Sequence, residues 1–126
     1  AGTSYLEALR VAARRDPAWG KFVPDPAFDP RTAVYPALPA EKRSLHSGYN
    51  WRKDPKSGAF RLGEDKFHAN TQGIYLLGCV WFEFFYGTSV VDNPFVPKGL
   101  SAEDAAVLQR VAHRVAGEKQ RPVPLP

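Results

Sequence analysis

Methionine is absent from the 126-residue chain, and cysteine occurs only once, at Cys79. A lone cysteine cannot form a disulfide within the chain, and its apolar neighbours predict a small buried side chain. A long hydrophobic run is missing too: the longest apolar stretch, residues 74–86, contains Glu83 and is too short to span a bilayer. We therefore expect no membrane span. Since the chain opens at Ala1 without methionine or a signal peptide, we expect this end to be a cut, a processing site or an incomplete record of the sequence.

Dense runs of like charge are also missing, although the net charge is +4. The basic residues form scattered pairs without interleaved stacking aromatics, at positions 14–15, 42–43, 52–53 and 119–121. Such a distribution is typical of a solvated surface, and it argues against nucleic acid as a partner. The redox compartment stays open, because a single cysteine does not report on it.

Three segments carry apolar residues at helical spacing, namely 5–14, 70–86 and 102–116. Gly87 is expected to end the second helix, and Ser101 with Asp104 resembles a capping box that opens the third. The inward face of the third helix is predicted to comprise Ala105, Leu108, Val111, Ala112 and Val115. Because residues 74–85 are apolar over three turns, we expect them to be the most buried segment.

Between the first two helices, the sequence favours irregular structure and one hairpin. Residues 19–39 are interrupted by prolines, each of which removes a donor and restricts the residue before it. Their aromatic side chains are expected to pack onto a core. Residues 44–51 and 59–62 are predicted to pair as a hairpin, because residues 54–58 form a strong turn signal.

Strands are too few for a complete layered domain. Three helices and one hairpin do not make an α/β unit with helices on both faces of a sheet. The inventory therefore predicts that part of the domain lies outside this chain, and that the chain alone needs more protein to fold stably.

Asp65 and His68 form the motif with the clearest chemical meaning, an Asp-x-x-His sequence directly before the second helix. Three residues of separation in a loop allow a carboxylate to reach the imidazole Nδ1. That contact fixes the tautomer, and a base oriented in this way activates a hydroxyl nucleophile. The alternative is a surface loop in which the aspartate merely precedes a helix and the histidine is solvated.

The surrounding sequence HANTQGIYLLGCVWFE, residues 68–83, resembles the last conserved block of SGNH (GDSL-type) hydrolases. The resemblance covers about residues 1–117 and is most specific over residues 65–87. By this resemblance Asp65 is the orienting carboxylate and His68 the general base of a catalytic triad. Gly73 would allow close approach of the helix, and Asn70 would cap it.

The same resemblance implies an α/β fold in which residues 1–117 are the C-terminal part of one three-layer α/β/α, flavodoxin-like domain. Residues 118–126 then form a proline-rich tail. The implied activity is serine-type hydrolysis of a small-molecule or carbohydrate ester, as in a bacterial subgroup of such proteins. It requires no cofactor or metal. Export to the periplasm or the exterior is implied by the family alone, since the sequence itself leaves the compartment open.

The serine end of the triad is not in this sequence. None of the serines lies in a Gly-Asp-Ser-like block, and the oxyanion-hole blocks of the family are missing as well. We therefore expect the chain alone to be inactive, and its partner to be a missing N-terminal half or another subunit. The alternative is a non-catalytic or degenerate SGNH-like module that binds an anionic polymer through its basic surface.

Two further residues are candidates for binding substrate. His46 lies in an aromatic-rich segment and Trp51 lies beside the predicted turn, so both are expected near a cleft, although packed structural roles are the alternative. His113 on the last helix is expected to face solvent. A metal site from His46, Asp65 and His68 matches no zinc-ligand spacing.

Overall fold

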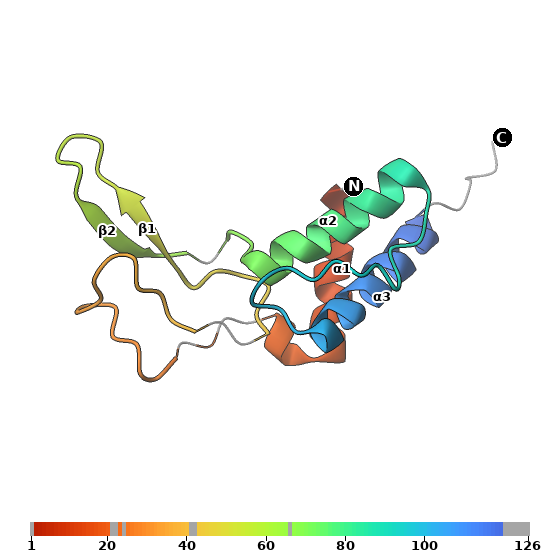
Figure 1. Cartoon of the computed structure of the whole chain (residues 1–126), viewed down its shortest axis with the longest axis horizontal. Helices are drawn as coiled ribbons and strands as arrows, with labels where there is room; N and C mark the ends of the chain where they lie inside the picture. Colours follow the sequence, from red (N-terminus) through yellow and green to blue (C-terminus); the bar gives the residue numbers. More distant parts are fainter. Residues whose placement is uncertain (1, 21–22, 24, 41–42, 66, 120–126) are drawn as a thin grey trace.

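The computed structural model describes residues 2–20, 23, 25–40, 43–65 and 67–119. It contains the helices α1 (Gly2–Arg15), α2 (Thr71–Tyr86) and α3 (Ala102–Lys119), a 3-10 turn η1 (Pro17–Trp19), and the strands β1 (Tyr49–Lys53) and β2 (Phe60–Glu64). The helices gather at one end of the molecule and the hairpin lies at the other (Figure 1). The three predicted helices and the hairpin are confirmed, and the chain is of mixed α/β class. The first strand, predicted at residues 44–51, lies at Tyr49–Lys53, and α3 continues through residues 118–119 of the predicted tail, whose remaining residues 120–126 lie outside the described part.

The core lies where the three helices meet. Helix α3 contacts both α1 and α2, and small residues of α1 allow close packing, since Ala8 and Ala12 are fully buried. Trp19 of η1 closes the base of this core. The predicted inward face of α3 is confirmed, because every one of its five members is buried: Ala105, Leu108, Val111, Ala112 and Val115.

The ends of α2 and α3 follow the sequence signals. Asn70 caps α2 by accepting a hydrogen bond from the Gly73 N–H. Gly87 ends the helix with a left-handed backbone at φ 60°, a conformation in which glycine carries no Cβ penalty. Ser101 accepts a hydrogen bond from the Asp104 N–H at the start of α3.

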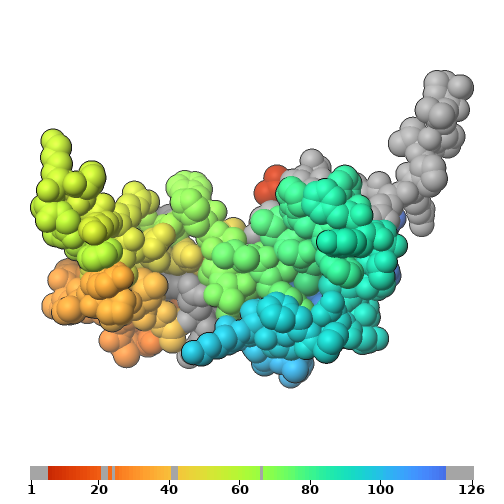
Figure 2. Space-filling view, turned by 45° about the horizontal axis from the view of Figure 1, so that its top comes forward, coloured from red at the N-terminus to blue at the C-terminus, as the bar shows by residue number. Residues whose placement is uncertain are grey.

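The proline-rich excursion packs on the hairpin at the end away from the helices, as Figure 2 shows in orange and yellow-green. Tyr35 stacks on Phe60 of β2 with ring centroids 3.9 Å apart. Trp51 of β1 meets Tyr35 edge-on and donates its indole N–H to the Ala37 carbonyl at 2.9 Å. The aromatic side chains of Phe28 and Tyr35 thus find their partners on the sheet. Among the described aromatic residues of the excursion, Trp19 alone enters the helical core.

A buried carboxylate ties α2 to α3 and to the loop between them. Glu83 is only 5% exposed and accepts a hydrogen bond from the Val90 N–H at 2.7 Å. Its oxygens lie 2.9 and 3.1 Å from Nδ1 of His113 on α3. The exposure predicted for His113 is correct in part: about half of the side chain is exposed, and the ring also pairs with a buried partner.

The expectation that residues 74–85 are the most buried segment is wrong for this chain. One face of α2 is buried through Leu76 and Val80. The opposite face is exposed, with Ile74 at 61%, Trp81 at 41% and Phe85 at 62%. The reason is that α1 and α3 cover only one side of the helix. Across the part of the chain that the structure describes, no helix has the length and apolarity needed to cross a membrane.

Gly73 allows the first turn of α2 to lie directly against the backbone of Leu45. A Cβ at this position would collide with the Leu45 carbonyl oxygen and with the Ala69 side chain, whereas a Cβ at Gly78 on the exposed face would meet nothing. Backbone atoms cannot move aside as a flexible side chain does. The glycine is therefore a requirement of packing at residue 73 and not at residue 78.

The two glycines make a matched pair for a stability test. We expect Gly73→Ala to lower the free energy of unfolding by about 1–3 kcal/mol through overpacking. Gly78→Ala is expected to raise it by up to about 1 kcal/mol through helix propensity. Urea unfolding followed by circular dichroism measures both. A Gly73→Ala variant as stable as the parent would contradict the close approach.

Candidate active site

Asp65 and His68 are in direct contact. The imidazole Nδ1 of His68 lies 2.9 and 3.0 Å from the two carboxylate oxygens of Asp65. With its proton on Nδ1, the ring donates to the carboxylate. The predicted hydrogen bond between these side chains is therefore confirmed.

Backbone pairing with the segment before β1 fixes the loop that carries both residues. The Asp65 N–H donates to the Gly48 carbonyl at 2.9 Å, and the Ser47 N–H donates to the His68 carbonyl at the same distance. An isolated antiparallel bridge joins His46 to Ala69. These contacts continue the hairpin ladder past Glu64, so the Asp–His loop is held from both ends.

Asp65 is 2% exposed and forms a tight turn with the residues that follow it. One of its oxygens accepts the backbone N–H groups of His68 at 3.0 Å and Phe67 at 3.2 Å. The pKa of Asp65 is lowered from 3.8 to about 2, chiefly by the His68 N–H, while burial opposes the shift. The imidazole and the Phe67 N–H lower the pKa further. The carboxylate therefore stays ionised across the physiological pH range.

This arrangement prepares the other ring nitrogen for proton transfer. A carboxylate on Nδ1 keeps the tautomer in which Nε2 carries a lone pair, and it stabilises the imidazolium that forms when Nε2 accepts a proton. The His68 side chain is 74% exposed, so Nε2 is accessible from outside the chain. Chemically, an oriented and accessible imidazole of this kind is able to act as a general base.

Among the residues that the structure describes, the cleft expected at His68 is not seen. Four cavities formed by described residues lie elsewhere, and His68 lines none of those four. The reason is geometric: the loop stands at the surface between the hairpin and α2, and Phe67 beside it is 91% exposed. Any wall opposite His68 has to come from outside the described residues.

The two proposed substrate-binding residues lie in different surroundings. His46 is next to the Asp–His loop through its bridge to Ala69, and its Nδ1 is buried without a hydrogen-bond partner among the described residues. Trp51 lies in β1, where it holds the proline-rich excursion through Ala37 and Tyr35. The structure thus brings His46 toward Asp65 and His68, and it gives Trp51 a packing role.

Neither metal ligation nor thiol chemistry adds a second centre. No group of three His, Cys, Asp or Glu side chains within the described ranges is arranged to hold a metal ion. Burial raises the pKa of Cys79 to about 11, which keeps the thiol protonated and unreactive at neutral pH. The prediction of a small buried cysteine is confirmed by its 3% exposure.

Sequence reasoning missed the contacts that support the loop. Asn70 was expected only as a cap, yet its amide also donates to the carbonyls of Ser44 and His46. The pairing of Glu83 with His113 was missed as well. The signal for it was present, because a lone carboxylate inside an apolar helix needs a partner when that helix is buried.

Comparison of the chain with protein-family models, with curated proteins and with solved structures finds no match.

The lowered pKa of Asp65 predicts how stability depends on acid. A carboxylate that binds its proton less readily when folded stabilises the protein above its ordinary pKa near 4, and this stabilisation is lost as the pH falls toward 2. Asp65→Asn should therefore be less stable than the parent at pH 7 and lose less stability on acidification. Urea unfolding at a series of pH values measures this.

Asp54→Asn is the matched control, because its carboxylate also accepts backbone N–H groups but lies in the solvated hairpin turn. We expect a smaller change for this variant, since solvent screens exposed charges. Equal acid dependence in Asp65→Asn and in the parent protein would refute the assignment.

Proposed function

We propose that this chain contributes the Asp–His pair of an SGNH-type serine ester hydrolase, with the nucleophilic serine supplied by protein outside these 126 residues. The observation that carries the proposal is the buried Asp65 carboxylate 2.9 Å from Nδ1 of an exposed imidazole. A histidine held in this way on a surface loop suits a base that acts on a group from another segment.

The roles follow from the acid–base chemistry of the pair. Nε2 of His68 would take the proton of the serine hydroxyl as its oxygen attacks the ester carbonyl carbon. The same nitrogen would return the proton to the leaving alcohol, and water would then release the acyl group by the same route. Asp65 would remain ionised throughout and hold the ring.

The uncovered face of α2 supports a partner close to the pair. Ile74, Gly78, Trp81 and Phe85 recur at intervals of four, three and four residues, which places them on one side of the helix. An apolar groove of about 550 Å³ runs beside this face, between α2 and the loop of residues 90–97. Covering each large apolar side chain stabilises by about 1.5–3 kcal/mol.

The position of this face matters as much as its area. Helix α2 begins three residues after His68, at Thr71, and its exposed stripe starts within the first turn. A sheet or helix packed on the stripe would reach the side of the molecule that carries His68. In an SGNH-like domain that cover would be the layer that also carries the serine. The proposal therefore includes the three-layer α/β/α fold, of which this chain would be the C-terminal part.

Labelling by a fluorophosphonate, which reacts with activated serines, tests the proposal. The material is the complete polypeptide that the gene encodes, together with any subunit that co-purifies. We expect labelling on a serine outside residues 1–126, and a loss of about 10³-fold or more in labelling rate for His68→Gln. His113→Gln is the matched control, since it removes an imidazole that also pairs with a buried carboxylate on a different face.

Two outcomes would overturn the proposal. One is that no serine of the native protein or its partners reacts. The other is that His68→Gln labels at the rate of the parent while remaining folded by circular dichroism.

The exposed stripe also predicts how residues 1–126 behave by themselves. A contiguous exposed apolar face favours association in water. We expect the isolated chain to self-associate in analytical ultracentrifugation, and Trp81→Gln with Phe85→Gln to shift it toward monomer. The control, Val23→Gln with Val34→Gln, removes two exposed apolar side chains elsewhere and should leave the mass distribution unchanged.

A monomeric parent chain with one sharp thermal transition would show that α2 needs no cover. That result would remove the structural support for a missing half.

A further inference from the structure

The arginines that are scattered in the sequence converge on one groove between α1 and α3. Arg14 and Arg15 end α1, while Arg110 and Arg114 are successive turns of α3, almost a hundred residues away. All four line a single groove of about 460 Å³. This volume falls within the roughly 300–1,000 Å³ of small-molecule pockets.

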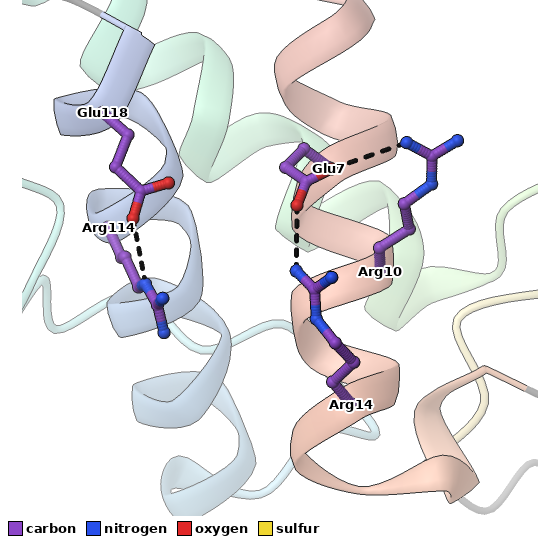
Figure 3. A network of polar contacts seen from close by, with 5 residues as sticks. All are labelled: Glu7, Arg10, Arg14, Arg114 and Glu118. Atoms are coloured by element: carbon purple, nitrogen blue, oxygen red, sulfur yellow. Dashed lines mark hydrogen bonds and ion pairs between the residues drawn. The ribbon is translucent and has the colours of Figure 1, made fainter.

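Two of these four guanidinium groups already have counter-charges. Arg14 pairs with Glu7 at 2.9 Å, and Arg114 pairs with Glu118 at 3.1 Å. Figure 3 shows these pairs on neighbouring helices, with Arg10 also reaching toward Glu7. Glu7 and Glu118 hold these two arginines, but neither glutamate lines the groove.

The other two guanidinium groups lack a carboxylate. Within the described part of the chain, neither Arg15 nor Arg110 forms an ion pair or a side-chain hydrogen bond. Four cations less two carboxylates leave a charge of +2 at the groove. The dipole of α1 favours basic residues in its last turn, which accounts for Arg14 and Arg15 but not for Arg110 in the middle of α3.

The floor of the groove is apolar. Val111 is 4% exposed and belongs to the core, and Val11 of α1 is half-buried beside it. The groove therefore combines a rigid aliphatic floor on two packed helices with a cationic rim. This combination suits a ligand that carries an anionic group on a small apolar body.

We propose that the groove between α1 and α3 binds a phosphate monoester, with Arg15 and Arg110 as the groups that hold the phosphate. A phosphate monoester carries about −1.5 to −2 charges at pH 7 and three strong acceptor oxygens. It therefore matches two free guanidinium forks that approach from facing helices, whereas a single carboxylate brings one charge and two oxygens. The Val11–Val111 floor contacts the esterified group.

A second basic cluster on the hairpin is the natural competitor. Arg52 and Arg61 are directly opposed in the β1–β2 register and line a cavity with Lys53 and Lys56. That cavity lies on the two-stranded sheet, away from the helical core, and none of its lining residues is buried. Since preorganisation favours the helix-built groove, the hairpin serves as the control.

Calorimetric titration of the complete encoded polypeptide with phenyl phosphate tests the inference, with inorganic phosphate as the probe that lacks the apolar body. We expect saturable binding of one phenyl phosphate, weaker binding of inorganic phosphate, and weakening of both by salt. Arg15→Gln with Arg110→Gln should reduce affinity by about tenfold or more for each charged hydrogen bond lost. Arg52→Gln with Arg61→Gln removes the same charge from the hairpin cluster and should change affinity less than about twofold.

Two vesicle compositions identify the source of the phosphate. Equal binding to vesicles of phosphatidylcholine with and without phosphatidic acid, together with binding of phenyl phosphate, assigns a soluble ligand. Selective binding to phosphatidic acid that is lost in the Arg15/Arg110 variant assigns a lipid headgroup.

The inference is overturned if phenyl phosphate does not bind saturably in the millimolar range, or if the hairpin variant loses as much affinity as the groove variant. Because the substituted arginines are exposed, both variants should unfold at the same temperature as the parent protein. A folded groove variant that binds phenyl phosphate as tightly as the parent also overturns the inference. The readout is binding and not ester hydrolysis, so it stands or falls separately from the proposed function.

Discussion

The contact between the first turn of α2 and the backbone of residues 44–46 is the constraint on which the rest of the structure depends. The Asn70 side chain accepts the Gly73 N–H and donates to the carbonyls of Ser44 and His46, and the Asn70 backbone N–H donates to the Leu45 carbonyl. Only glycine at residue 73 allows the two segments to come this close. The junction joins the helical core to the hairpin, and the Asp–His loop lies directly upstream of it.

The chemistry of the site follows from this junction. Residues 46–48 extend the hairpin ladder to the loop. They form backbone hydrogen bonds with both Asp65 and His68, and this pairing holds Asp65 in its buried position. A carboxylate in that position gains three N–H donors, and its ionised form is favoured despite burial. His68 is left with one ring nitrogen held and the other accessible. The fixed orientation of the His68 ring therefore depends on the fold and not on the two side chains alone.

Much of this arrangement could be predicted from local sequence. Helix periodicity, the Asn70 cap, the Gly87 stop and the turn at Asp54–Gly58 all act over a few residues, and each has its expected place. Burial of α2 could not be predicted in the same way. Periodicity shows which residues of the helix are apolar, but it does not show which of them another helix covers. The meeting of Arg14 and Arg15 with Arg110 and Arg114 depends on the crossing of α1 and α3, which no local pattern encodes.

Nuclear magnetic resonance of the His68 imidazole in ¹⁵N-labelled protein tests the central claim most directly, because it reports which nitrogen carries the proton. The account predicts that neutral His68 is protonated at Nδ1, with that proton shielded from exchange by Asp65, and that Asp65→Asn alters this state while Asp54→Asn does not. A neutral ring protonated at Nε2, or a spectrum unchanged by Asp65→Asn, would contradict it.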